Sequence, residues 1–191
     1  MFNLIAPVYG FFYHSQKKNF HQIITKNKNN LDISSYRNIV DVGCGTGALC
    51  SALLNEDILV TGVEPALNML NIGAKKTENK DVTFIQGSTE KGLIFEDKSF
   101  DLSITSYVAH GLYLEQRIKL YKEMSRITKH FVILHDYNQS RSVWTNIIEW
   151  AERGDYFNFI KNVDKELKEN FKSVRVVSVG NKASWYICEP L

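Results

Sequence analysis

Apolar residues gather in short blocks along the chain, and most blocks are followed by a longer stretch with a different periodicity. Five blocks, each four to six residues long and rich in branched aliphatic side chains, fall at 38–42, 58–63, 82–86, 102–105 and 130–134. Apolar runs of this length predict β-strands that are buried on both faces of a sheet. Two further runs at 174–179 and 183–188, separated by a turn at Gly180-Asn181, predict a terminal hairpin.

The stretches between the strands carry apolar residues at spacings of three and four, which is the pattern of amphipathic helices. Helices are expected at 15–28, 48–55, 66–73, 114–128, 144–151 and 156–167. Pro65 suits the first turn of the helix at 66–73. Residues 1–14 are rich in aromatic side chains but contain Pro7 and Gly10, so irregular structure or a broken helix is expected there.

Strands that alternate with helices predict an α/β fold with a mostly parallel sheet. A chain of 191 residues, of which 44% are hydrophobic, can bury a sizeable core, so residues 1–191 are interpreted as a single domain. Within this domain, 1–30 would form an N-terminal helical lid. Residues 138–170 would form a helical segment before the terminal hairpin.

Charge and cysteine usage narrow the function classes. The chain has 23 Lys and Arg against 21 Asp and Glu, a net charge of +2, and no basic cluster, so no nucleic-acid partner is expected. The apolar N-terminus lacks a basic start, and no run approaches the roughly 18 residues that span a bilayer, so neither a signal peptide nor stable membrane insertion is expected. Cys44, Cys50 and Cys188 lack metal-ligand spacing, which predicts no metal site and fits a cytoplasmic protein. Nothing in the sequence predicts the oligomeric state.

The stretch VDVGCGTGALC at 40–50 joins the first predicted strand to the helix that follows it. Gly43, Gly45 and Gly47 stand there at every second position. Glycine adopts positive φ without a Cβ penalty and allows a ligand to approach the main chain closely. Free N–H groups at the helix start add donors with partial positive charge. Such a turn is suited to hold a nucleoside-bearing ligand against the backbone.

Two ligands remain open for this turn. Gly43, Gly45 and Ala48 satisfy the dinucleotide pattern G-x-G-x-x-A, which predicts a nicotinamide cofactor. Asp41 favours another ligand, because a carboxylate at the strand end repels a pyrophosphate but accepts hydrogen bonds from an ammonium group. The pattern D-x-G-x-G-x-G, from Asp41 to Gly47, resembles motif I of the class I S-adenosylmethionine-dependent methyltransferases.

The resemblance implies a Rossmann-like, doubly wound, mostly parallel seven-stranded sheet with an antiparallel C-terminal strand, and S-adenosyl-L-methionine as the cofactor. It implies that Asp41 lies beside the methionine moiety, and that the cofactor is wrapped by the loop of Gly43, Cys44, Gly45 and Gly47. The segment LIFEDKSFDLSITSYVAH at 93–110 is similar to the family's L-P-F-x-D-x-S-F-D, which leads into the fourth strand.

The N-terminal segment carries a second resemblance. The order F-N-x-I-A-P-x-Y at 2–9 resembles the opening of the ubiquinone and menaquinone C-methyltransferases, although Gly10 stands where these enzymes usually carry an acid. Two roles stay open for this segment: a lid that packs on the core without chemistry, or a segment that closes over the cofactor. The ring faces of Tyr9, Tyr13 or Tyr107 could stabilise the sulfonium cation. We therefore place Tyr9 at the cofactor and Tyr13 at the substrate.

Glu64 ends the second predicted strand, 21 residues after Gly43. A carboxylate at this place can accept both hydroxyls of a ribose, and the alternative is an acid that caps the next helix. Pro65 and Met69 follow it, and Met69 could touch the purine face as well as pack in the core. After the third strand, Ser88 and Thr89 stand where the resembled family often has G-D-A-E, so a hydroxyl replaces the acid that binds the adenine amino group.

Residues just past the fourth and fifth strands would face the crevice where open α/β sheets bind ligands. Ser106 is expected at the cofactor, and Tyr107, His110 and His135 at the substrate. His110 is the candidate general base, because the ordinary imidazole pKa lies near working pH. The alternative for His110 is a hydrogen-bonded loop histidine without a chemical role.

The predicted activity is methyl transfer from a sulfonium to a small-molecule acceptor by in-line displacement, in which the protein mainly positions the two partners. The N/D-P-P-Y/F signature is missing after the fourth strand, so amino-methylating DNA or glutamine enzymes are disfavoured. The N-terminal match suggests an aromatic or quinone-like acceptor. Two alternatives stay open: a nicotinamide-dependent oxidoreductase, and a protein that binds S-adenosylmethionine without catalysis.

Overall fold

The structure is a computed structural model that describes residues 2–54, 57–138 and 155–191, and only the main chain of 2–9 and 77. A seven-stranded sheet in the order β3-β2-β1-β4-β5-β7-β6 runs through its centre. The strands are β1 Asn38–Val42, β2 Leu59–Glu64, β3 Val82–Gln86, β4 Phe100–Ser106, β5 Thr128–Tyr137, β6 Ser173–Ser178 and β7 Ala183–Glu189. Pairings among the first five are parallel, whereas β7 runs antiparallel to both β5 and β6. The predicted α/β sheet with an antiparallel last strand is confirmed.

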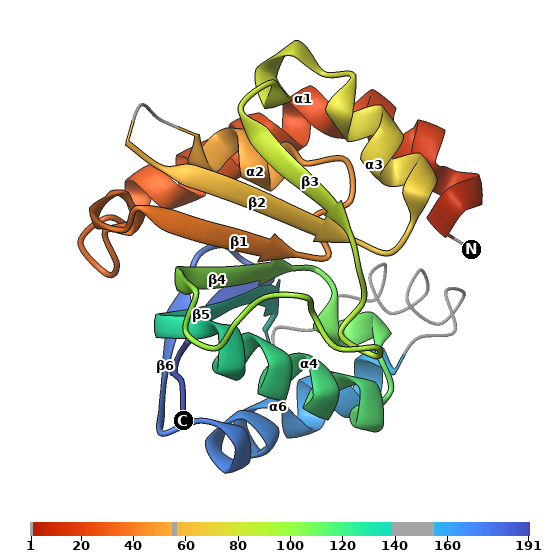
Figure 1. Ribbon diagram of the computed structural model, residues 1–191. Coiled ribbons are helices and arrows are strands. Elements are labelled where there is room, and N and C mark those ends of the chain that lie inside the picture. Colours follow the sequence, from red (N-terminus) through yellow and green to blue (C-terminus); the bar gives the residue numbers. More distant parts are fainter. Residues whose placement is uncertain (1, 55–56, 139–154) are drawn as a thin grey trace.

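Helices cover both faces of this sheet (Figure 1). One face carries α1 Phe2–Lys26, α2 Ala48–Leu53 and α3 Leu67–Ala74, and the other carries α4 Leu114–Ile127 and α6 Tyr156–Asn170. Three short 3₁₀ turns complete the described elements: η1 Ile33–Ser35, η2 Thr77–Asn79 and η3 Ala109–Gly111. The arrangement is the doubly wound one that strand–helix alternation predicts.

The N-terminal segment departs from the prediction, because α1 runs as one helix from Phe2 to Lys26 through Pro7 and Gly10. Packing against α2 and α3 accounts for this continuity. At Gly10 a Cβ atom would lie 3.1 Å from Ile72 Cγ2, so the absent side chain lets the two helices approach closely. Tertiary contact therefore outweighs the weak local preference against helix at these two residues.

Other helices and strands begin or end a few residues away from their predicted boundaries. The fifth strand was expected to end at Leu134, but β5 continues to Tyr137 because β7 pairs with it from Val132 to Tyr137. Helix α3 begins at Leu67 with Ala66 as its N-cap, so Pro65 precedes the helix instead of lying in its first turn. The helix expected at 144–151, and the part of the 138–170 segment before 155, lie outside the described residues.

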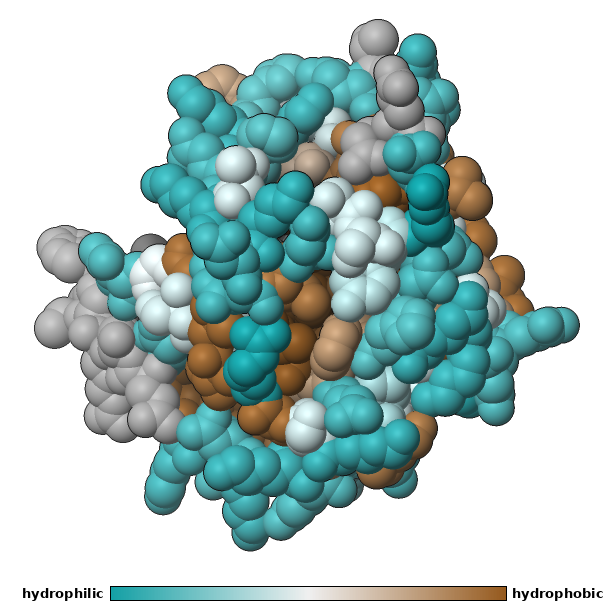
Figure 2. Space-filling model, turned by 90° about the vertical axis from the view of Figure 1, so that its left-hand side faces the viewer, coloured by the Kyte–Doolittle hydropathy of each residue, from teal (hydrophilic) through white to brown (hydrophobic). Residues whose placement is uncertain are grey.

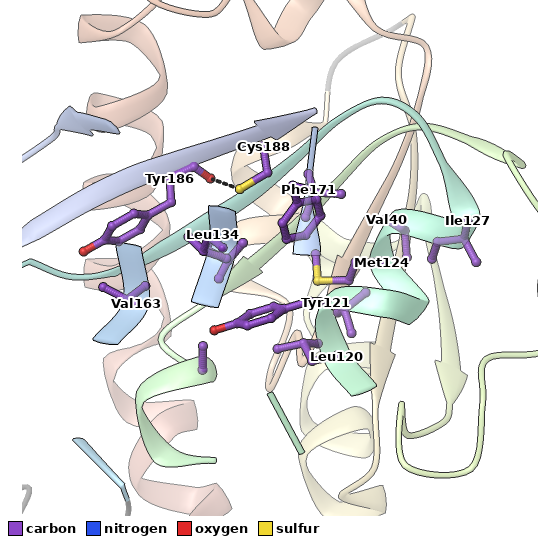
Figure 3. Packing of buried hydrophobic residues seen from close by; sticks show 14 of the residues in the cluster. Val40, Leu120, Tyr121, Met124, Ile127, Leu134, Val163, Phe171, Tyr186 and Cys188 are labelled. Atoms are coloured by element: carbon purple, nitrogen blue, oxygen red, sulfur yellow. Dashed lines mark hydrogen bonds between the residues drawn. The ribbon is translucent and has the colours of Figure 1, made fainter. Parts of the chain in front are cut away.

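Alternate residues of the strands enter two hydrophobic clusters on opposite faces of the sheet. Val40 and Leu134 pack with α4 and α6, whereas Ile39 and Ile133 pack on the side of α1 and α2. In Figure 3 the side chains of α4 point toward the sheet and the residues that follow α6, into the first cluster. This alternation fixes which side chains at the strand ends share a face.

The carboxyl ends of β1 and β2 point to the right in Figure 1. Figure 2 shows the opposite side of the molecule, where hydrophilic residues surround one central apolar area. Among the described residues, no helix combines the length and the apolar character needed to cross a bilayer.

Candidate functional site

The turn between β1 and α2 has three glycines with positive φ: 83° at Gly43, 54° at Gly45 and 76° at Gly47. These φ values are strained for any residue with a Cβ atom. The N–H groups of Gly43 and Cys44 donate to the carbonyl oxygen of Val63, at 2.8 and 3.0 Å. The turn is therefore tied to the end of the neighbouring strand β2.

Two of the three glycines are also required by close packing. A Cβ at Gly43 would lie 2.5 Å from Val108 Cγ2, and a Cβ at Gly47 would lie 2.6 Å from Phe84 Cζ. At Gly45 a Cβ would meet nothing within 4 Å. The middle glycine thus faces open space, and its main chain is where a ligand can approach the turn.

Glu64 at the end of β2 joins the turn to the next helix. Its Oε2 accepts the Gly45 N–H at 3.1 Å, and its Oε1 accepts the Ala66 N–H at 2.9 Å. The side chain is buried, and burial raises the pKa of its carboxyl despite these two hydrogen bonds. Glu64 thus binds the main chain of the turn and of Ala66, the residue before α3, and both the ribose role and the helix-end role stay predictions. Each carboxylate oxygen retains a second lone pair, which a hydroxyl donor can use.

Asp41 lies in β1, two residues before the turn, and is only 1% exposed. Its Oδ2 accepts a hydrogen bond from the Cys50 thiol at 3.4 Å, whereas its Oδ1 has no partner among the described residues. Burial raises the pKa of Asp41 to about 7, and the nearby charge of Glu64 adds to the rise. A buried carboxylate oxygen without a donor is costly, and a cationic ligand group would remove that cost.

Two more polar atoms at the strand ends lack partners within the described ranges: Ser106 Oγ and His135 Nε2. Ser106 pairs with His135 across β4 and β5, and Ile104, two residues earlier in β4, pairs with Asp41 across β1. Residues paired in register face the same side of a sheet, so all three polar side chains lie on the face that α1 covers. Unsatisfied buried polar atoms gathered in this way are typical of a ligand site.

Tyr13, expected at the substrate, is a residue of α1 and is fully buried. Its hydroxyl donates to Asn79 Oδ1 at 2.9 Å, and Asn79 Nδ2 donates to the carbonyl oxygens of Thr46 and Gly73. In this conformation Tyr13 supports the glycine turn from behind, and a contact with a substrate stays a prediction. The side chain of Tyr9 lies outside the described residues.

The residues expected around the adenosine lie beside the ends of β2 and β3. Met69 is buried against Ala66 and Ile72, as its core alternative predicts. Pro65 is exposed next to Glu64, and Ser88 and Thr89 are half-buried after β3. Ser88 Oγ accepts the Glu90 N–H at 3.2 Å. Contacts of these residues with a cofactor stay predictions.

His110 has a partner that the sequence did not reveal. Its Nδ1 lies 2.8 Å from Asp136 Oδ1, and its main-chain N–H donates to Asp136 Oδ2 at 3.3 Å. Asp136 is 1% exposed, and its Oδ1 also accepts the Tyr137 N–H at 2.8 Å. A carboxylate only accepts, so a neutral His110 ring carries its proton on Nδ1, and Nε2 is then the basic nitrogen of the ring.

Aromatic rings surround this histidine. The ring centroids of Tyr137, Tyr156 and Tyr107 lie 4.8, 6.3 and 6.4 Å from that of His110. Tyr107 also lies 4.9 Å from His135 and has φ 53°, a strained value for a non-glycine residue. Burial, with the charge of Asp136, raises the pKa of Tyr107 to about 12, so its phenol stays neutral. Three tyrosine rings thus pack around a buried histidine that is held by a buried carboxylate.

The known proteins that this chain resembles are described as methyltransferases. Residues 40–134 match the family described as Methyltransferase domain. A protein of Geobacillus sp. (strain WCH70) named as a methyltransferase is 40% identical over 95 residues, 48% of this chain and 36% of that protein. An uncharacterized methyltransferase of Mycolicibacterium gilvum (strain PYR-GCK) is 33% identical over 91 residues, 48% of this chain and 34% of that protein. The chain thus spans about a third of the length of these curated relatives.

Solved structures share the fold. A crystal structure named as that of an S-adenosyl-L-methionine-dependent methyltransferase from Methanococcus maripaludis superposes with a TM-score of 0.72 at 18% identity, over 100% of this chain and 94% of that one. At this identity the likeness shows the fold alone. It agrees with the seven-stranded order described above.

Proposed function

The chain belongs to the class I S-adenosylmethionine-dependent methyltransferases, and from this premise we propose that it transfers a methyl group from S-adenosylmethionine to a small-molecule acceptor. The observation that carries the proposal is the pair of buried acids, Asp41 and Glu64, on either side of the glycine turn. One of them holds the Gly45 N–H, and the other has a carboxylate oxygen without a partner among the described residues.

These residues fit the cofactor. Asp41 Oδ1 would accept from the ammonium of the methionine moiety, Glu64 would accept from the ribose hydroxyls, and the open side of Gly45 would leave room for the ligand. Ser106, at the end of β4, offers a further hydroxyl to the methionine end. When bound, S-adenosylmethionine supplies a methyl group that its positive sulfonium makes electrophilic.

The surroundings of His110 support a small acceptor with a proton to lose. The imidazole is buried beside the carboxylate of Asp136 and among tyrosine rings, so it can take a proton from a phenol, an amine or an activated carbon acid. Methyl transfer to a phenol oxygen or to a carbon acid releases a proton that a base takes, whereas a neutral amine first gives a methylated ammonium, which then loses its proton. The resemblance of residues 2–9 to quinone C-methyltransferases agrees with an aromatic acceptor, and it stays a prediction.

The test has two parts. Calorimetric titration should show binding of S-adenosylmethionine and no binding of NAD, and isotope-labelled methyl donor should report transfer in a panel of small phenols, amines and quinols. Binding of NAD without binding of S-adenosylmethionine would support the alternative that the protein is a nicotinamide-dependent oxidoreductase. Tight binding of the donor without transfer to any acceptor would support the non-catalytic alternative.

Variants of the two acids test the site. We expect Asp41→Ala and Glu64→Ala each to weaken donor binding by about 1 kcal/mol or more, the order of a lost charge-assisted hydrogen bond. Asp81→Ala removes an exposed acid that pairs with Lys80, far along the chain from the turn, and serves as the control. Unchanged affinity in both site variants would refute the assignment.

A further inference from the structure

His135 in β5 has its two ring nitrogens in different situations. Trp185 Nε1–H donates to His135 Nδ1 at 3.0 Å. An indole N–H only donates, so Nδ1 must act as an acceptor and the proton of the ring lies on Nε2. That Nε2–H finds no acceptor among the described residues, although His135 is only 2% exposed. The residue therefore presents one buried, unpaired donor.

The ring stays neutral over the physiological range. Burial lowers the pKa of His135 to about 4, and the opposing effect of the Asp136 charge is smaller. Protonation of Nδ1 would also break the hydrogen bond from Trp185. His135 is therefore a fixed donor, unlike His110, whose Nδ1 faces a carboxylate.

The surroundings of this donor are aromatic on two sides. Phe20 of α1 and Tyr107 pack against the imidazole with ring centroids 5.6 and 4.9 Å away. Ser106 is the residue directly paired with His135 across β4 and β5, and its Oγ also lacks a partner in the described ranges. Two unsatisfied polar groups thus lie side by side, between aromatic rings, at the strand ends that face α1.

We propose that His135 is a specificity-determining residue whose Nε2–H binds an oxygen atom on an aromatic methyl acceptor. The inference rests on the proposed function and adds a class of substrate to it. A site that holds a buried donor discriminates strongly against analogues without the matching acceptor, because the donor then stays unpaired. His110 would take the proton, and His135 would select molecules that carry the oxygen.

The first experiment measures the protonation state and the tautomer of the His135 imidazole. A long-range ¹H–¹⁵N spectrum of the whole protein, with the His135 signals assigned by their loss in His135→Gln, should show the neutral Nε2–H tautomer from pH 6 to 8. In Trp185→Phe the other tautomer should become populated. A charged ring or an Nδ1–H tautomer in the wild-type protein would overturn the inference.

The second experiment adds small probes: phenol, benzoate and toluene, each titrated with and without S-adenosylhomocysteine. Phenol or benzoate should shift the His135 Nε2–H resonance, and toluene should leave it in place. Equal effects of all three probes, or no effect of any, would refute the oxygen contact. Failure of S-adenosylhomocysteine to bind would instead refute the proposed function, so the two failures are distinguished.

With an acceptor identified by the labelled-donor screen, kinetics separate recognition from packing. His135→Phe keeps a ring but removes the donor, and should lower kcat/KM about 10- to 100-fold, mainly through KM, without changing donor affinity. His135→Gln places an amide donor near the same position and should recover most of this loss. His130→Phe, an exposed histidine at the other end of β5, is the matched control. Equal activity of His135→Phe and the wild-type protein would contradict the proposal.

Discussion

Single residues at the strand ends couple this site to pH, and Asp41 does so most directly. The pKa of Asp41 in the folded protein is about 7, above the usual value of 3.8, so between these two pH values the folded state holds a proton that the unfolded chain releases. The stability this provides is complete below pH 3.8 and is lost as the pH rises through 7. An asparagine at position 41 would keep nearly the same side-chain shape but could not ionise, so Asp41→Asn isolates the effect of the carboxyl group on stability.

We expect the free energy of unfolding of Asp41→Asn, relative to the wild-type protein, to increase between pH 5 and 8 by on the order of 2 kcal/mol. Urea denaturation of both proteins at four pH values in this interval measures the difference. Parallel pH curves for the two proteins would show that the Asp41 pKa is not raised by burial.

A second prediction concerns the rate of methyl transfer when His110 or Asp136 is replaced. We expect His110→Gln to lower the rate of methyl transfer about 100-fold, the usual size of a general-base contribution. Asp136→Asn should lower it by about tenfold, because the ring loses its fixed tautomer but keeps a neighbour. Single-turnover assays with labelled donor measure both rates.

Donor affinity should stay the same in both variants, since the proposed contacts of the donor are with Asp41, Glu64 and the glycine turn. His130→Phe is again the control. If neither substitution slows transfer at saturating acceptor, the acceptor needs no proton removed and His110 is the hydrogen-bonded loop histidine of the alternative interpretation.

Spacing along the chain was enough to predict that Asp41 and Glu64 lie beside the glycine turn, because both positions follow from the strand–glycine–helix pattern. It was not enough to find Asp136 as the partner of His110. The two residues are 26 positions apart and meet only through the parallel pairing of β4 and β5. Pairing register depends on the whole sheet, so local periodicity cannot supply it.

At the scale of elements, helices α4 and α6 are joined by one buried ion-pair group. Arg117 of α4 is 1% exposed and donates to both carboxylate oxygens of Glu166 in α6, at 2.7 and 2.8 Å. Its remaining nitrogen donates to Asp155, at the start of α6, at 2.9 Å. Along α4 this arginine reads as an ordinary exposed polar residue, so its burial could not be predicted from the sequence.

Removal of one partner should be costly, because it leaves the other charge buried and unpaired. We expect Arg117→Met to lower the free energy of unfolding by about 3–5 kcal/mol. The double variant Arg117→Met/Glu166→Met should recover most of this loss. Urea denaturation measures both effects.

Lys165→Met supplies the control, since Lys165 pairs with Glu169 on the exposed face of the same helix, and should change stability by less than about 0.5 kcal/mol. A loss of similar size in the arginine and lysine variants would indicate that Arg117 acts only through exposed charge.

Helix α1 shows the limit of local signals for a whole element. Pro7 and Gly10 are poor helix residues, and a broken segment was the reasonable expectation. The helix continues because its partners α2 and α3 lie along it, and because Gly10 fits closely against Ile72. The strands and the remaining described helices were predicted within a few residues, since their apolar periodicity agrees with their burial.

At the scale of the whole molecule, the candidate site is built from strands on both sides of the β1–β4 pair in the middle of the sheet. The glycine turn follows β1, Glu64 ends β2, Ser106 ends β4 and His135 lies in β5. Each of these strands also contributes to the two hydrophobic clusters. A ligand that bridges the strand ends should therefore stabilise the entire domain and not a single loop.

We expect S-adenosylhomocysteine at 100 times its Kd to stabilise the folded protein by about 2.7 kcal/mol through mass action. For a domain of this size the melting temperature should rise by about 5–10 °C. NAD at the same concentration should leave it unchanged, because Asp41 opposes a pyrophosphate. Glu64→Gln should reduce the rise at equal ligand concentration, since the neutral amide is a weaker acceptor for a ribose hydroxyl, whereas Asp81→Ala should preserve it. Differential scanning calorimetry measures all four cases, and equal shifts with both ligands would mean that the turn does not distinguish the cofactors.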